Sequence, residues 1–241
     1  SSLSRMKKIL LISYYWPPNA GVGARRWLNF QKYLAKEFSI TVYTPENPSM
    51  LNEDNSLLNQ VSSGTQVIKQ KIWEPYDLYK RFTKKRKVNP GVLIDSTNGL
   101  KDKFTHWVRS NFFIPDAKCF WIEHSVSFLS KLFSKENYDF VISTGPPHSM
   151  HLIALKLSEK HNFKWIADFR DPWTNMEYFS KIPLLDSSRR KHFDLEKKVI
   201  SKADLILTVS KFWSKEFSQL GAKNTEIVYN GFDKHNSTIE F

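Results

Sequence analysis

Short apolar runs alternate with longer segments of helical periodicity along most of the chain, and this alternation limits the folds that the sequence can adopt. The runs end at small or polar residues, and the segments between them carry apolar side chains three or four positions apart. Such repeats predict parallel strands joined by crossover helices. We therefore expect an α/β fold of the doubly wound, Rossmann-like type, with one parallel sheet covered by helices on both faces.

The pattern predicts strands in both halves of the chain, with a less regular stretch between them. Strands are expected at residues 9–13, 40–44, 67–70, 140–143, 164–168, 204–209 and 226–229. Helices are expected at 24–36, 101–113, 117–133, 149–161, 187–202 and 211–220. Residues 76–87 fit either a helix or a loop. Between about 46 and 135 we expect a helical and basic insertion.

In doubly wound sheets, ligands bind beyond the carboxyl ends of the strands. After the first strand, Gly21 and Gly23 precede a helix, where backbone N–H groups can approach a phosphate, and Arg25 or Arg26 could add a charged contact. The alternative is a tight turn that needs glycine only for its backbone angles. Arg26 occupies the position of the third glycine of the dinucleotide fingerprint, which disfavours an NAD site.

Two further strand ends carry polar side chains. His148 stands in the first turn of a predicted helix, where it can bind a substrate hydroxyl or phosphate, or cap the helix. Asp168 ends a strand, and Arg170 and Asp171 follow in the loop. A carboxylate can orient or deprotonate a hydroxyl while the arginine binds an anion, and the alternative is an ion pair that locks the loop.

A surplus of cations, 36 Lys and Arg against 24 Asp and Glu, gives a net charge of +12 and favours an anionic partner. Six of the eight residues Lys80–Lys87 are basic. They could contact an anionic membrane surface, at about 1 kcal/mol for each cation, or form a solvated insertion. The only cysteine is Cys119, and no stretch reaches a membrane-spanning length. We expect a cytoplasmic protein, with peripheral contact at the inner face of the membrane left open.

In their order and spacing, five segments resemble the family 4 (group 1) glycosyltransferases of GT-B fold: residues 7–26, 143–149, 167–173, 203–210 and 228–233. The resemblance implies the N-terminal, acceptor-side half of an enzyme with two Rossmann-like domains. It implies retaining transfer of a sugar from a nucleotide-sugar donor to a glycan or lipid-linked acceptor, in polysaccharide biosynthesis for example, with no cofactor and no metal ion.

The same resemblance implies roles for individual residues. Gly21 and Gly23, with Arg25 beside them, would approach the donor diphosphate. Asp168 falls where many relatives carry a histidine beside the reacting sugar, which makes it the candidate catalytic residue. His148, Arg170 and Asp171 would line the acceptor side.

The domain boundaries also follow from the resemblance. Residues 6–232 would form the acceptor-side domain, and 233–241 would begin the linker to a C-terminal donor domain. The Glu-x7-Glu donor motif of the family does not occur here, so we expect these 241 residues to fold but not to turn over by themselves. A second hypothesis is another nucleotide-binding Rossmann enzyme that uses NAD. A third is a basic nucleic-acid-binding module, which no helix-turn-helix, RNP or zinc pattern supports, so no nucleic acid is expected as a partner.

Overall fold

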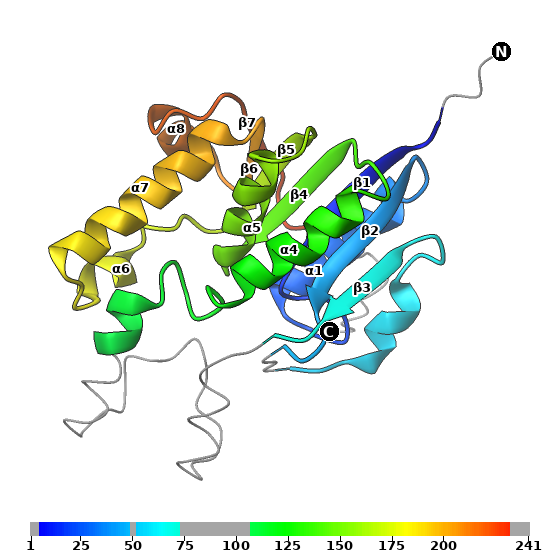
Figure 1. Ribbon diagram of the computed structural model, residues 1–241, viewed down its shortest axis with the longest axis horizontal. Coiled ribbons are helices and arrows are strands. Elements are labelled where there is room, and N and C mark those ends of the chain that lie inside the picture. The colour runs from blue at the N-terminus through cyan, green and yellow to red at the C-terminus, as the bar shows by residue number, and fades with distance from the viewer. Residues whose placement is uncertain (1–4, 49–51, 73–106, 232–241) are drawn as a thin grey trace, which may run out of the picture.

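A computed structural model describes residues 5–48, 52–72 and 107–231, and these form an α/β domain around a single seven-stranded sheet (Figure 1). The strand order is β3-β2-β1-β4-β5-β6-β7, and every pair of neighbouring strands is parallel. The order reverses between β1 and β4, as in a doubly wound sheet. The expected fold class is therefore confirmed.

All seven predicted strands are present, with ends that differ by at most two residues. They are β1 (Lys7–Ile12), β2 (Phe38–Pro45), β3 (Gln66–Gln70), β4 (Phe140–Gly145), β5 (Lys164–Phe169), β6 (Leu205–Thr208) and β7 (Thr225–Ile227).

The helices that follow the strands are also as predicted, with shifted ends. They are α1 (Val22–Leu34), α4 (Trp121–Phe133), α5 (Ser149–Ser158), α7 (Asp186–Lys202) and α8 (Lys211–Gln219). Residues 107–112 are helical too, and the predicted start of that helix lies outside the described residues. The structure adds a 3-10 helix η1 (Asn55–Gln60) and a short helix α6 (Glu177–Lys181) that periodicity did not predict. Both are too short to show a repeating apolar face.

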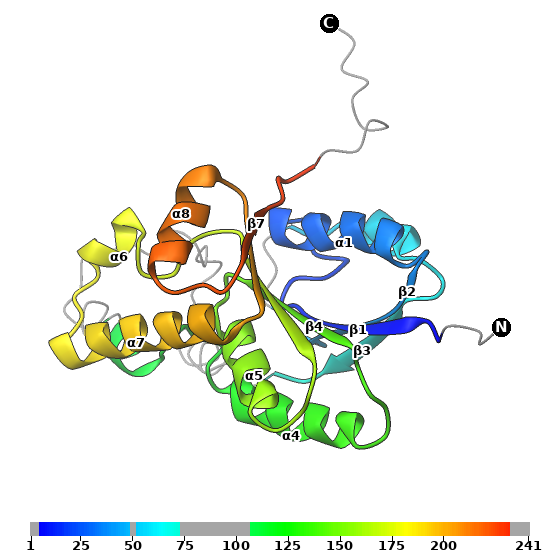
Figure 2. The ribbon, with the colours of Figure 1, turned by 90° about the horizontal axis from the view of Figure 1, so that it is seen from above.

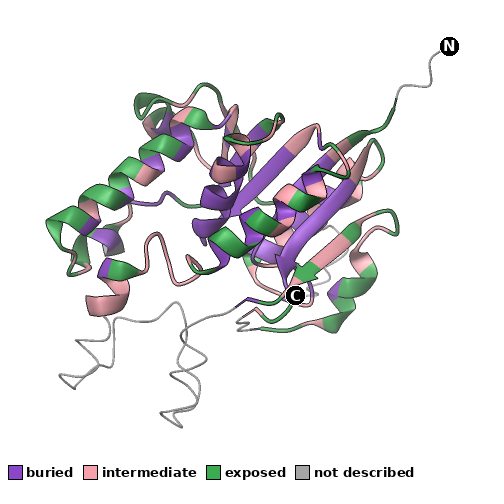
Figure 3. Ribbon diagram, in the orientation of Figure 1, coloured by how far each residue is buried: buried purple, intermediate pink, exposed green. Residues whose placement is uncertain are grey.

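Helices cover the two faces of the sheet, with α1 on one side and α4 and α5 on the other (Figure 2). Side chains of β1 supply both interfaces, because neighbouring residues of a strand point to opposite faces. Leu10 and Ile12 join the core under α4 and α5, and Ile9 and Leu11 join the smaller core under α1. Burial is accordingly concentrated along the central strands, while the outer surfaces of the helices are exposed (Figure 3).

The register of the central strands brings the predicted site residues together. Thr144 of β4 lies opposite Asp168 of β5, and Gly145 lies opposite Phe169. The loops after β1, β4 and β5 therefore leave the sheet at the same edge.

Residues Lys80–Lys87 and the region 76–87 lie outside the described residues, so neither their helix-or-loop alternative nor their membrane contact is tested. Within the described part of the chain, no helix is both long and apolar enough to cross a membrane.

Candidate functional site

The site lies at the carboxyl edge of the sheet, where the loops after β1, β4 and β5 meet. The backbone N–H of Arg170 donates to the carbonyl of Gly145 at 3.2 Å, and the Arg170 guanidinium donates to the carbonyl of Pro146. These bonds join the loop after β5 to the loop after β4. Arg170 also contacts Gly23, so it links the start of α1 to these two loops.

Gly21 and Gly23 open α1 as the sequence predicts. Gly21 is the N-cap, and its N–H is held by the Asn19 side chain at 2.9 Å. A Cβ at Gly23 would lie only 2.2 Å from a guanidinium nitrogen of Arg170, so the missing side chain makes room for that cation. The first N–H groups of a helix have no partner within it. Here the start of α1 at Gly23 stands beside the half-buried guanidinium of Arg170, which is an arrangement suited to an anion.

The guanidinium of Arg170 is partly removed from solvent and lies near other charged groups. Burial lowers the pKa of its guanidinium, although an arginine stays protonated at any pH of interest. Asp168, Asp171 and Tyr15 act against that shift. The Nε of Arg170 is buried, and it has no hydrogen-bond partner among the described residues. Asp171 itself is exposed at the loop.

Asp168 forms a fully buried ion pair with Arg26 of α1, and neither side chain has exposed surface. The guanidinium donates to both carboxylate oxygens, at 2.9 and 3.2 Å. The indole of Trp27 donates to Asp168 at 2.7 Å, and the hydroxyl of Thr144 does so at 2.9 Å. The carboxylate of Asp168 is thus surrounded by donors from β4 and α1. Its expected catalytic role stays a prediction, and these contacts favour a positioning role.

Arg26 also holds the end of the described chain. Its other nitrogen donates to the carbonyl of Val228 at 2.8 Å and to the side chain of Asn230 at 2.9 Å. Arg25, the arginine that we expected at the phosphate, donates to the carbonyl of Ala20 and lies 3.7 Å from Asp54. Sequence reasoning named Arg26 but gave no reason to pair it with Asp168.

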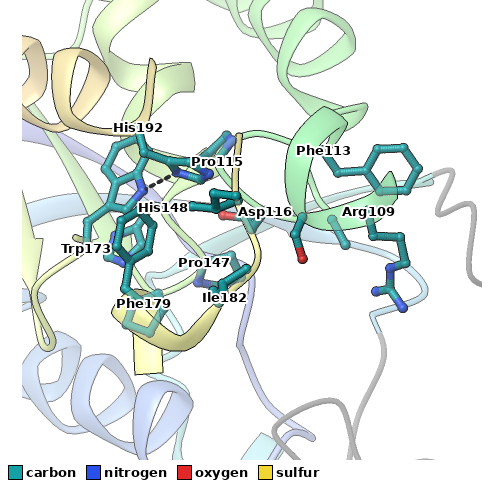
Figure 4. A pocket seen from close by; sticks show the side chains of 14 residues that line it. Arg109, Phe113, Pro115, Asp116, Pro147, His148, Trp173, Phe179, Ile182 and His192 are labelled. Carbon is teal, nitrogen blue, oxygen red and sulfur yellow. Dashed lines mark hydrogen bonds between the residues drawn. The ribbon is translucent and has the colours of Figure 1, made fainter. Parts of the chain in front are cut away.

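His148 lines a pocket of about 230 Å³ beyond the ends of β4 and β5 (Figure 4). Its ring stacks on the indole of Trp173, with centroids 5.1 Å apart and planes 2° from parallel. The Trp173 indole in turn donates to Nδ1 of His192 at 3.0 Å, the bond drawn in Figure 4. Burial lowers the pKa of His148 to about 3 and that of His192 to about 4, so both rings are neutral near pH 7.

The nitrogens of His148 set it apart from an ordinary core histidine. Both are buried, and neither has a hydrogen-bond partner among the described residues. The helix-capping alternative is also disfavoured. His148 is the N-cap of α5 but makes no side-chain cap bond, and that task falls to Asp116, which accepts from the N–H and hydroxyl of Ser149 at 2.9 and 2.7 Å. Buried polar groups without partners are uncommon and mark candidate functional positions.

Glu196 of α7 fixes the loop that carries Trp173. Its carboxylate accepts from the backbone N–H of Trp173 at 3.0 Å, from the N–H of Thr174 at 3.2 Å and from the Thr174 hydroxyl. Burial raises its pKa, against those hydrogen bonds. Sequence reasoning missed Glu196, Trp173 and His192 as site residues, because a helix side chain and a loop backbone 23 positions apart show no shared pattern.

The three residues expected on the acceptor side have different surroundings. His148 lines the pocket, whereas Arg170 and Asp171 do not. Arg170 belongs instead with the glycines at the start of α1. Among the residues that the structure describes, no group of three or more His, Cys, Asp or Glu side chains could hold a metal ion.

The comparison with solved structures agrees with the fold. A sucrose-phosphate synthase from Thermosynechococcus elongatus matches 92% of the chain at 13% identity with a TM-score of 0.53, over 48% of its own length. UGT71G1 of Medicago truncatula, solved with UDP-glucose, matches 92% at 8% identity with a TM-score of 0.52, over 51% of its length. The chain thus spans about half the length of these structures. No curated protein sequence matches it.

The sheet order defines a Rossmann-like domain, and the solved structures that it matches have the GT-B fold. The family model described as Glycosyltransferase Family 4 matches residues 23–236. The chain belongs to this family, as the resemblance of its motifs predicted.

Proposed function

We propose that the chain is the acceptor-side domain of a retaining glycosyltransferase that moves a sugar from a nucleotide-sugar donor to an acceptor hydroxyl. Family membership supports transfer as the reaction class. The observation that carries the proposal for this site is the contact between Gly23 and Arg170, which places a half-buried cation against the start of α1. Charge develops on the leaving diphosphate during transfer, and fixed N–H groups with a cation stabilise it.

The acceptor would occupy the pocket beside His148. The unpartnered nitrogens of His148 support a role for this ring in orienting a hydroxyl, because one nitrogen of a neutral histidine donates and the other accepts. Asp168 would act through Arg26 and Trp27, by fixing the start of α1 relative to β5. Asp171, exposed at the rim, stays a proposed acceptor contact.

Transfer by the protein encoded by the whole reading frame that contains these residues tests the proposal. Labelled UDP-, GDP- and ADP-sugars are offered with glycan and lipid-linked acceptors, and product is measured with and without a chelator. We expect transfer from one donor class, with retained anomeric configuration and no loss on chelation. The same assay on the 241 residues alone should give no turnover. Absence of transfer from every donor, or reduction of a nicotinamide cofactor instead, would contradict the proposal.

Contact with an anionic membrane remains a separate proposal that rests on the basic run Lys80–Lys87 and the net charge of +12. Co-sedimentation with vesicles rich in phosphatidylglycerol tests it. We expect binding that falls as salt rises and that is lost when the six basic residues are replaced by glutamine. Equal binding to neutral vesicles would contradict it.

A further inference from the structure

The pocket beside His148 is walled mainly by carbon (Figure 4). Trp173 and Phe179 form one side, and Phe113 lies on the opposite side. The residues that supply its apolar walls are Phe113, Pro115, Trp173, Phe179, Ile182 and Leu184. They come from the segment before α4, from the loop after β5 and from the residues around α6. Pockets of this composition take ligands with an apolar body and few polar atoms.

The polar groups of the pocket are largely occupied by the protein itself. Asp116 accepts from the N–H and hydroxyl of Ser149 and from the N–H of Lys118. Nδ1 of His192 accepts from the indole of Trp173. A ligand rich in hydroxyl groups would therefore lose water on entering without finding replacement partners for most of them, which disfavours its binding.

The charge of the pocket also disfavours a phosphorylated ligand. His148 and His192 are neutral near pH 7, because burial holds the pKa of each well below its ordinary value. Among the described residues, the charged side chains that line the pocket are Arg109 and Asp116, and the carboxylate of Asp116 would repel a phosphate placed between the two rings. Arg109 lies on the far side of the pocket from Trp173 (Figure 4).

We propose that this pocket binds an uncharged, apolar part of the acceptor, of about the size of an aromatic ring with substituents, and not a sugar ring or a sugar phosphate. The inference rests on the proposed function, since it specifies the acceptor of the same site. The pocket volume of about 230 Å³ is large enough for a substituted aromatic ring, because a cavity of roughly 150 Å³ holds benzene. The hydroxyl that receives the sugar would then lie next to His148.

Titration of the protein with 1-naphthol, glucose and glucose 6-phosphate in a calorimeter tests this inference without any donor. We expect one naphthol to bind per chain, and neither sugar to bind at the same concentrations. Ile182→Gln should weaken naphthol binding about tenfold by placing an amide in the apolar wall. The matched control is Leu185→Gln, three positions away, because Leu185 is exposed and does not line the pocket. Leu184→Gln serves as a second pocket variant if Ile182→Gln does not fold.

Each outcome either supports or overturns the inference. Naphthol binding that is weakened in the pocket variants and unchanged in the control supports it. Failure of naphthol to bind, equal binding of glucose 6-phosphate, or equal effects of the pocket and control substitutions overturns it. Naphthol binding in a protein that transfers no sugar would contradict the proposed function alone, and transfer to an acceptor by a protein that does not bind naphthol would contradict this inference alone.

Discussion

Arg26 and Asp168, 142 positions apart in the sequence, form an ion pair whose two side chains have no exposed surface. The pair joins the N-terminal part of α1 to the end of β5, and Arg26 also bonds to Val228 and Asn230. A buried pair with this many hydrogen bonds is costly to break, because removal of one partner leaves the other charged and without a counterion. Its place beside Gly23 makes it the support of the proposed diphosphate site.

Replacing Asp168 by Asn should therefore destabilise the domain. We expect a loss of about 3–5 kcal/mol in the free energy of unfolding, because Arg26 would remain buried and charged. Denaturant unfolding followed by circular dichroism measures it. Arg25→Met is the matched control, since the Arg25 side chain is partly exposed and its pairing with Asp54 at 3.7 Å is a surface contact. Equal unfolding midpoints for Asp168→Asn and the wild type would contradict the structural role.

The two neutral histidines at the pocket should make stability depend on pH. Their folded pKa values, about 3 for His148 and about 4 for His192, lie below the ordinary value of 6.5. The contribution of the two neutral rings to the free energy of unfolding is fully present above pH 6.5. It is lost as pH falls toward those pKa values, because the unfolded chain then binds protons that the folded chain does not. We expect the free energy of unfolding to fall with decreasing pH by up to about 1.4 kcal/mol per pH unit for each ring.

A substitution separates the pocket from other titrating groups. His192→Gln keeps an acceptor for the Trp173 indole and removes one titrating ring, so the slope between pH 6.5 and pH 4 should become shallower. His124→Asn, at an exposed position of α4, should leave the slope unchanged. Unfolding curves at half-unit pH steps provide the measurement. A slope that is the same in the His192 variant and the wild type would show that His192 is not held neutral.

Glu196→Gln should loosen the loop that carries Trp173. The amide oxygen can replace only part of the carboxylate, and the new NH₂ group faces N–H donors. We expect a loss of about 1–3 kcal/mol in the free energy of unfolding, together with a raised acceptor KM and a smaller change in kcat. Glu226→Gln, at an exposed position of β7, is the control. A variant with unchanged acceptor KM would contradict the positioning role of Glu196.

The sequence allowed the framework to be predicted because strand and helix periodicities are local. It also predicted that residues after β1, β4 and β5 would gather at one edge, since parallel strands share their carboxyl ends. It could not predict which side chains meet there. From the sequence, the arginine nearest to Asp168 was Arg170 in the loop after β5. In the structure, the carboxylate of Asp168 pairs with Arg26 instead.

The capping of α5 shows the same limit. His148 was the local candidate for the cap, and the acceptor is Asp116, 33 positions before Ser149. The partners of Trp173 are equally distant: one is a histidine and the other a glutamate of α7. Such contacts depend on how helices pack across the sheet, which no periodicity of a single segment records.

Transfer assayed on Gly23→Ala tests the central claim most directly. A methyl group there would lie 2.2 Å from the Arg170 guanidinium and displace it from the start of α1. Gly64→Ala is the matched control, because no atom lies within 4 Å of its added Cβ. In the protein encoded by the whole reading frame, we expect sugar transfer by the wild type and Gly64→Ala, and a loss of about a hundredfold in kcat/KM for Gly23→Ala. Equal transfer by all three proteins would contradict the account.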